Sequence, residues 1–197
     1  MAQGSRSLRF LLVLAVIGLL LCQGDAWRRR RRRRCKSPGQ ALTGAQTRWD
    51  AAFQFECPGS QVIRRVSSVH CNRAEDRVWK FGCGSVPGLP RFDEEFWSGW
   101  INDFDGVMNF QCPFDAIITG LRSEHNNGRE DRRWNVKCSR KRGMQTYNCA
   151  LSPYANSLDG DMNYSVSSGY YLRGLHSFHS NKHEDRRYKF NVCKIRL

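Results

Sequence analysis

Short stretches in which apolar and polar residues alternate recur along most of the chain. Residues 53–57 alternate in this way and predict a half-buried strand, which ends at a Pro-Gly turn. An apolar run at residues 62–69 predicts a second strand. Alternation at residues 77–83 predicts a third strand that turns Arg77 and Trp79 toward the interior. These residues therefore form a unit of three short strands.

This unit occurs three times. The triplet Glu-Asp-Arg opens its third strand in each copy, and the starts of the triplets are separated by 55 and then 54 residues. A fixed period of this length indicates a fold built from copies of one supersecondary unit. Further positions stay in register without a gap when Asp50, Asp105 and Asp159 are aligned. The columns contain Phe55, Phe110 and Tyr164; Ile63, Ile118 and Leu172; Ser68, Ser123 and Ser177; His70, His125 and His179; Asn72, Asn127 and Asn181; and Trp79, Trp134 and Tyr188.

The repeats define the expected fold class and domain. They span residues 49–83, 104–138 and 158–193, within a single domain at residues 35–197. About 160 residues are enough to bury a substantial core. Three units of three or four strands predict an all-β, disulfide-bonded body with pseudo-threefold symmetry, resembling a β-prism, with a β-trefoil as the alternative. The Pro and Gly residues concentrate in the connectors between repeats, and no helix is expected in the domain.

The nine cysteines fit a disulfide framework. Cys22 lies in the N-terminal segment, which leaves eight, an even number suited to four bridges in an oxidising compartment. In the aligned repeats, Cys57 and Cys112 occupy one position, and Cys83 and Cys138 occupy another. The third repeat has valine at both positions. Because the two partners of a bond are lost together, we predict the bonds Cys57–Cys83 and Cys112–Cys138.

Four cysteines remain, and they allow three pairings. We favour Cys35–Cys71 and Cys149–Cys193 because each pair then lies within or beside one repeat. A zinc site is the alternative, but it would need closely spaced cysteines or Cys/His clusters, which the sequence lacks. No metal or other cofactor is therefore expected.

The N-terminus has the pattern of a secretory signal peptide at residues 1–26. Two arginines precede an apolar run at residues 10–21, which small residues follow, and this run is too short to span a membrane. Seven consecutive arginines follow at residues 28–34. We favour a processing site, so that residues 27–34 end a short propeptide, over a retained cationic tail that binds polyanions.

The net charge of +14 is shared unevenly. Residues 1–34 contain nine arginines and one aspartate, a surplus of +8, so residues 35–197 keep +6. A moderately basic exported domain attracts sulfated glycans and proteoglycans of cell surfaces or matrix, and also an anionic membrane surface. A nucleic-acid partner is not expected, because the chain is exported and has none of the usual binding motifs.

The repeated residues resemble those of the dermatopontin family over roughly residues 48–197, and three spaced copies make the match specific. The resemblance implies a secreted, disulfide-bonded, non-enzymatic protein. Vertebrate members are extracellular-matrix proteins that bind proteoglycans, collagen and cells, and some invertebrate relatives are haemagglutinins, cell-aggregating factors or cytotoxins. The motifs are Asp-Arg-x-Trp/Tyr-x-Phe/Val at residues 76–81, 131–136 and 185–190, and Phe-x-Cys-Pro at residues 55–58 and 110–113.

The chain departs from the vertebrate pattern at its N-terminus. It lacks the tyrosine-rich acidic segment of those members, with six tyrosines in all, and has the arginine run instead. This difference counts against a collagen-matrix role and leaves the cell-surface roles open.

The nine triplet residues have two interpretations. They form three sugar-binding sites, in which a carboxylate beside an arginine holds a hydroxyl group, or a structural core, in which each inward arginine stacks on an aromatic ring and pairs with a carboxylate. We favour the structural interpretation because a symmetric core demands identity in all three copies. The triplets are Glu75, Asp76 and Arg77; Glu130, Asp131 and Arg132; and Glu184, Asp185 and Arg186.

No enzymatic activity is predicted. The serine that recurs in each repeat lies two residues before the recurring histidine, on the same face of one strand. This arrangement differs from that of a catalytic serine and the histidine that acts as its base. The histidines are expected to be structural residues near turns, with no cysteine close enough to indicate a metal site. Asn163 begins the only N-glycosylation sequon and is expected to point outward and carry a glycan.

We therefore expect a secreted, extracellular protein that binds cell-surface or matrix glycans through a basic outer face and mediates adhesion or aggregation. Lys80, Arg133, Arg187 and Lys189 are the candidate ligand contacts, because they are placed on the outer sides of the third strands. Threefold repetition would make the binding multivalent. The alternative is a secreted cytotoxin or haemagglutinin, released from a precursor when the arginine run is cut.

Overall fold

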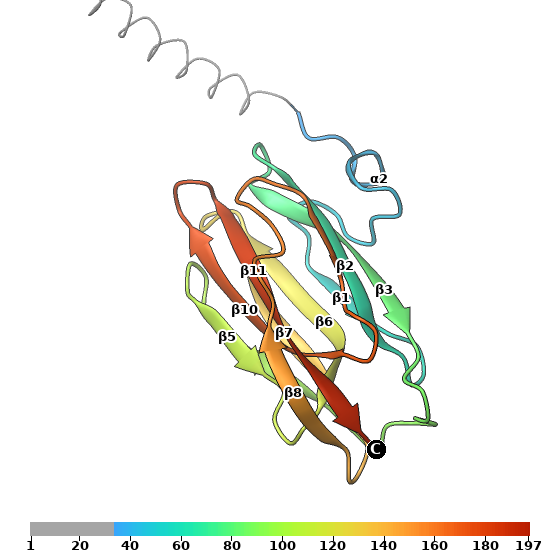
Figure 1. Cartoon of the computed structure of the whole chain (residues 1–197). Helices are drawn as coiled ribbons and strands as arrows, with labels where there is room; N and C mark the ends of the chain where they lie inside the picture. The colour runs from blue at the N-terminus through green and yellow to red at the C-terminus, as the bar shows by residue number, and fades with distance from the viewer. Residues whose placement is uncertain (1–33) are drawn as a thin grey trace, which may run out of the picture. The chain divides into compact units, whose positions relative to one another are not determined.

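Antiparallel β-strands form almost all of the regular structure (Figure 1). The computed structural model describes residues 34–197, so the expected signal peptide and nearly all of the arginine run lie outside the described residues. Within these residues no helix has the length and apolar character to span a membrane. The elements are α2 (Pro38–Ala41), β1 (Phe53–Glu56), β2 (Val62–Cys71), β3 (Asp76–Gly84), β4 (Glu94–Trp100), β5 (Met108–Gln111), β6 (Ile117–Asn126), β7 (Asp131–Arg140), β8 (Gln145–Leu151), β9 (Met162–Ser165), β10 (Tyr171–Ser180) and β11 (Asp185–Arg196).

The strands form three sheets, and each sheet combines two neighbouring repeats. The first sheet has the order β3-β2-β9, the second β1-β6-β7-β4 and the third β5-β10-β11-β8. Each repeat thus donates its short first strand to the hairpin of the next repeat, and the third repeat donates β9 back to the first. The registers are equivalent, with Phe55 opposite Leu121, Phe110 opposite Leu175 and Tyr164 opposite Val66.

Two segments that the sequence pattern marks as connectors contain strands. Residues 84–100 include β4, which pairs with β7, and residues 139–158 include β8, which pairs with β11. Both are edge strands whose residues are mostly exposed or half-buried. An edge strand of this kind lacks the apolar alternation that identifies a half-buried strand, so the interpretation as connectors was wrong.

The first repeat has a covering N-terminal segment where the other two have an edge strand. The backbone N–H of Gln46 donates to the carbonyl of Trp79 at 2.8 Å, and the hydroxyl of Thr47 accepts the N–H of Trp79 at 2.8 Å. This segment includes α2, a single turn that Pro38 starts, although no helix was expected. The outer side of β3 is therefore partly covered, and Val78 on that side is fully buried.

The core brings the three repeats together through aromatic rings. Trp79, Trp134 and Tyr188, one from each repeat, are all buried and meet edge to face. Their ring centroids lie 4.9, 5.4 and 6.1 Å apart. Each such pair contributes roughly 0.5–1.5 kcal/mol beyond the burial of its area. The column of aromatic residues in the sequence therefore marks the centre of the fold.

Four disulfides cross-link the strands. Two of them join the residue that follows a donated strand to the third strand of the same repeat, and so connect two sheets. One ties the N-terminal segment to β2, and one ties β8 to β11. The bonds are, in this order, Cys57–Cys83, Cys112–Cys138, Cys35–Cys71 and Cys149–Cys193. The first two are the pairs expected from the repeat register, and the last two are the pairing favoured among the three possible ones.

Candidate functional site

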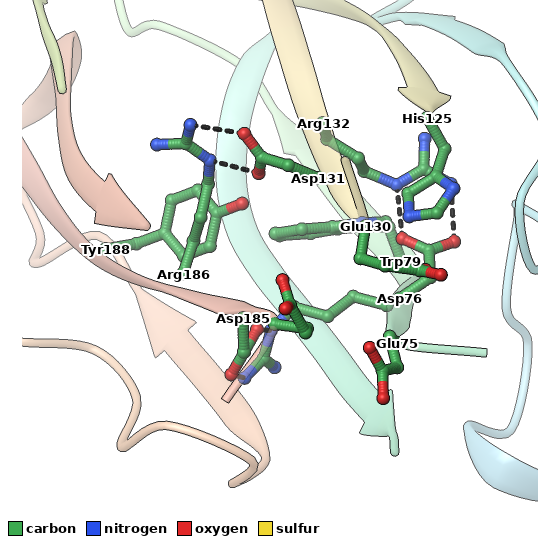
Figure 2. A pocket seen from close by; sticks show the side chains of 12 residues that line it. Glu75, Asp76, Trp79, His125, Glu130, Asp131, Arg132, Asp185, Arg186 and Tyr188 are labelled. Carbon is green, nitrogen blue, oxygen red and sulfur yellow. Dashed lines mark hydrogen bonds and ion pairs between the residues drawn. The ribbon is translucent and has the colours of Figure 1, made fainter. Parts of the chain in front are cut away.

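The aspartates and arginines of the triplets meet between the repeats (Figure 2). Each arginine donates two hydrogen bonds, from Nε and Nη2, to the carboxylate of the preceding repeat, over 2.6–2.7 Å. All six residues are at most 5% exposed. Bidentate pairs of this geometry are the strong form of charge-assisted hydrogen bond. The pairs are Arg77–Asp185, Arg132–Asp76 and Arg186–Asp131.

Backbone groups add to this ring of ion pairs. The carboxylate of Asp76 also accepts the backbone N–H of Asp50 at 2.8 Å, and Arg132 donates to the carbonyl of Ala51 at 3.1 Å. The other two repeats have the same contacts, at Asp105 and Gly106 and at Asp159 and Gly160. The ring therefore holds each neighbouring loop in place, which supports the structural interpretation of the aspartates and arginines.

Electrostatics within the ring favour the charged state. Burial by itself would raise the pKa of Asp185, but the imidazole of His70, 3.4 Å away, and the charge of the Arg77 guanidinium outweigh burial and hold that pKa well below its usual range. Arg132 also lies over the ring of Phe53, with 5.5 Å between the guanidinium carbon and the ring centroid. Removing one partner would leave the other buried and charged without a counter-ion.

The glutamates of the triplets line a small pocket beside the ring (Figure 2). Glu75, Glu130 and Glu184 have φ angles of 46–47°, in the left-handed region that non-glycine residues seldom adopt. Burial, and next the charge of Glu75, raise the pKa of Glu130. The pocket volume of about 20 Å³ is far below the roughly 300–1,000 Å³ of ordinary ligand pockets, so the pocket is a poor fit for a sugar ring.

Two of the four candidate ligand contacts are occupied by neighbours within the chain. The amino group of Lys80 on β3 donates to the carbonyl of Thr43 at 2.9 Å. On β7, the guanidinium of Arg133 pairs with Glu124 and lies over Trp100, 4.3 Å from the ring centroid. The contact of Lys80 with a distant loop was not visible in the sequence pattern, whereas Glu124 and Arg133 lie opposite each other on one hairpin. Both contacts leave Lys80 and Arg133 poorly suited to an external anion.

The other two candidates, Arg187 and Lys189, share the ring of Tyr154, at 3.7 and 4.4 Å from its centroid. Two more cations of β11 lie over tyrosines in the same way, and the sequence analysis missed them because the tyrosines are distant in sequence. Among residues 34–197, no carboxylate lies within 4.0 Å of any of these four cations. We call them the third-sheet cations: Arg187 and Lys189 over Tyr154, Lys194 over Tyr170 and Arg196 over Tyr147.

The charge of the third sheet differs from that of the second. The strands of the third sheet contain six lysines or arginines and one acidic residue, Asp185, which is buried against Arg77. The strands of the second sheet contain five basic and five acidic residues. The third sheet therefore has a larger surplus of positive charge than the second. The first sheet, with four basic residues and Asp76, has a surplus as well.

The sequon asparagine lies in the open. Asn163 on β9 is exposed, and its side-chain oxygen accepts a hydrogen bond from the hydroxyl of Ser67 at 3.2 Å. It lines a groove that Lys80 and Leu42 also line. The position leaves room for a glycan, which stays a prediction.

Known proteins with similar sequences include dermatopontins, a haemagglutinin and aggregation factor, and a cytotoxin. The Dermatopontin family model matches residues 47–197. The chain is 39% identical over 150 residues to the "Hemagglutinin/amebocyte aggregation factor" of Limulus polyphemus, covering 75% of this chain and 86% of that protein. It is 39% identical over 142 residues to dermatopontin of Biomphalaria glabrata (72% and 94%) and 35% over 148 residues to Millepora cytotoxin-1 of Millepora dichotoma (74% and 64%). No solved structure matches the chain.

Proposed function

Because the chain belongs to the dermatopontin family, we propose that it is a secreted, non-enzymatic protein that binds sulfated or acidic glycans and so mediates adhesion or aggregation of cells. The partners are glycans or proteoglycans of cell surfaces or of the extracellular matrix. The observation that carries this proposal is the row of third-sheet cations without carboxylate partners. Four disulfides also fit an oxidising, extracellular setting.

The third-sheet cations are arranged for repeated anionic groups. Arg187 and Lys189 alternate along β11, so their stems stand roughly 6.5–7 Å apart on one side of the strand. A cation over an aromatic ring is held in position at an exposed site by roughly 0.5–1 kcal/mol, while its N–H groups stay available to a sulfate or carboxylate. Because the tyrosines already hold these side chains in place, less conformational entropy is lost when they bind a ligand.

The test compares two quadruple variants that have the same net charge. One replaces the four third-sheet cations with glutamine. The control replaces four exposed cations outside the third sheet, Arg48, Arg73, Arg91 and Lys182, with glutamine. Binding of the secreted protein to immobilised heparin is then measured as a function of salt. We expect the first variant to lose at least roughly tenfold in affinity and the control to lose much less, because exposed charges act over only about 8 Å at physiological ionic strength.

Salt provides the second readout. Affinity of the unmodified protein should fall steadily as salt rises, since exposed ion pairs are screened. Equal loss in the two variants would show that overall charge, and not this surface, determines binding. Salt-insensitive binding that a neutral sugar blocks would point back to the triplets as sugar-binding sites.

A cytotoxin or haemagglutinin is the second candidate, because two of the relatives carry those names. The same preparations distinguish a clumping activity from a toxic one on red blood cells. Clumping without release of haemoglobin supports adhesion or haemagglutination, and release of haemoglobin supports a cytotoxin. An anionic membrane surface would then be the partner in place of a glycan.

We also propose that residues 1–34 are removed during export, in two steps at the signal peptide and at the arginine run. The intact mass of the secreted protein reports this directly. A mass that retains the seven arginines would establish the cationic tail in place of the propeptide, and would add a second anionic-glycan contact to the third sheet.

A further inference from the structure

A buried histidine faces two aspartates at every junction between neighbouring repeats. We propose that these junctions are binding sites for a divalent transition-metal ion of the Zn²⁺ type, which would link each repeat to the next. This site is separate from the third-sheet cations and does not depend on the proposed function. The three sets are His125 with Asp50 and Asp76, His179 with Asp105 and Asp131, and His70 with Asp159 and Asp185.

The spacing of the donor atoms fits one ion in two of the sets. In these two sets the candidate ligand atoms all lie within 4.8 Å of one another. The third set converges less well, because His70 faces Asp185 with Nδ1, at 3.4 Å, and Asp159 with Nε2, at 3.9 Å. Most of these separations are too long for a direct hydrogen bond. Two ligands bound to one Zn²⁺, each roughly 2.0–2.2 Å from the metal, stand about 3–4 Å apart.

The histidine nitrogens lack partners within the described part of the chain. The side chains of His70, His125 and His179 are 0–1% exposed. Neither ring nitrogen of His70 has a hydrogen-bond partner among residues 34–197, and the same holds for Nε2 of His125 and of His179. The carboxylate oxygens Asp105 Oδ1 and Asp159 Oδ1 are also buried without one. A buried polar atom of this kind is costly unless a ligand satisfies it.

Two of the histidines are oriented by an asparagine two residues further along the chain. Asn127 Oδ1 lies 2.9 Å from His125 Nδ1, and Asn181 Oδ1 lies 3.2 Å from His179 Nδ1. An amide oxygen only accepts, so Nδ1 carries the proton in these contacts and Nε2 keeps its lone pair. Metal-bound histidines usually donate their second nitrogen to such an oxygen. The column of asparagines in the sequence therefore has a physical role at two junctions.

The charge within each set also favours a cation. One aspartate of each set pairs with a guanidinium of the ring, and the loop aspartate adds a second negative charge. Among residues 34–197, Arg129 lies 3.4 Å from Asp105 and is largely exposed, and His183 lies 3.1 Å from Asp159.

The donor types point to the ion class. Imidazole nitrogen with carboxylate oxygens suits Zn²⁺, whereas Ca²⁺ and Mg²⁺ favour sites built from oxygen alone. Each loop aspartate keeps a side toward solvent, with 24–41% of its side chain exposed. That side gives the ion a path of entry and leaves room for water to complete its coordination.

The test uses the untagged secreted protein after dialysis against a chelator. Isothermal titration with ZnCl₂ should show up to three equivalents, and the thermal midpoint should rise with added Zn²⁺ because the ion binds only the folded state. The variant Asp50→Asn/Asp105→Asn removes one ligand from each of two junctions. Asparagine tolerates the φ angles of 57° and 62° at these positions, and neither side chain belongs to the ring of ion pairs.

The matched control is Asp103→Asn/Asp161→Asn, two exposed aspartates beside the loop aspartates. We expect the ligand variant to lose two equivalents, or to bind at least roughly tenfold more weakly, and the control to bind as the unmodified protein does. A second variant, His125→Gln/His179→Gln, should give the same loss, and its thermal midpoint without metal reports whether it folds. No binding of Zn²⁺, equal binding by ligand variant and control, or an equal response to CaCl₂ would each overturn the proposal.

Discussion

The second and third sheets share one inner structure and differ on their outer surfaces. Inside, each contributes an arginine to the ring, Arg132 and Arg186, and an aromatic residue to the core. Outside, acidic residues are as numerous as basic residues on the second sheet, whereas the third-sheet cations have no carboxylate partner within residues 34–197. Repetition therefore preserves what the core needs, and the outer side of each copy is free to diverge.

One cross-strand position shows the divergence. Glu124 lies opposite Arg133 in the second sheet and neutralises it. The equivalent position of the third sheet holds Phe178 opposite Arg187, and Phe178 packs edge to face on Tyr154. A glutamate in one sheet is thus replaced by an aromatic residue in the other, and only the second arrangement leaves the arginine available to an external anion.

The inner similarity is tested by removing the ring arginines. Arg132→Ala and Arg186→Ala should each lower the free energy of unfolding by about 3–5 kcal/mol, because each leaves a buried aspartate without its counter-ion. Chemical denaturation measures both. Arg133→Ala is the control on the surface, where loss of an exposed pair costs at most about 1 kcal/mol. A large difference between the two ring variants would show that the repeats are not equivalent inside.

The outer difference is tested at the cross-strand position. Phe178→Glu gives the third sheet the carboxylate that the second sheet has, so Arg187 gains an internal partner. We expect heparin affinity to fall by roughly tenfold or less, the effect of one charge pair on the order of 1 kcal/mol. Phe178→Gln, which adds no charge, is the control. Heparin affinities of the two variants that agree within error would remove the role given to Arg187.

The reciprocal change should have the smallest effect. Glu124→Gln frees Arg133 on the second sheet, although the stacking on Trp100 remains. We expect heparin affinity to rise by roughly two- to threefold, since one uncompensated cation adds a fraction of 1 kcal/mol. Stability should change by less than about 1 kcal/mol. A decrease in heparin affinity would contradict the view that neighbouring acidic residues prevent the cations of the second sheet from binding an anionic glycan.

The sequence was sufficient to predict the structural features that recur in each repeat. Columns in register predicted the all-β class, and the paired loss of two cysteines in the third repeat, where Val166 and Val192 stand, indicated two disulfides. The inward position of the ring arginines also followed from alternation along the strand. Each of these features is local to one repeat, so a periodic pattern carries it.

Features that join distant residues did not follow from the pattern. A column of arginines shows that a partner exists, but not that Arg77 takes the aspartate of the third repeat, 108 residues away. The prediction of Lys80 as a ligand contact failed for the same reason, because its hydrogen-bond partner lies in a loop 37 residues earlier. The pair of Glu124 and Arg133 could have been predicted from the sequence, because both residues flank one hairpin turn and the turn sets which residues lie opposite each other. Threefold multivalency was expected, but the sheets differ: among residues 34–197, Arg64 and Arg65 of the first sheet and the third-sheet cations have no carboxylate partner, whereas most cations of the second sheet have one.

The donated strands also set the order in which the molecule can be completed during synthesis. Ser67 on β2 and Asn163 on β9 are 96 residues apart in the sequence and meet in the first sheet. The ribosome therefore releases the first hairpin long before the strand that completes its edge. Until then β2 has one unpaired edge, a surface open to any other extended chain, including another copy of the same nascent protein. The first sheet therefore cannot be completed until β9 has been synthesised, although its hairpin is the first to be made.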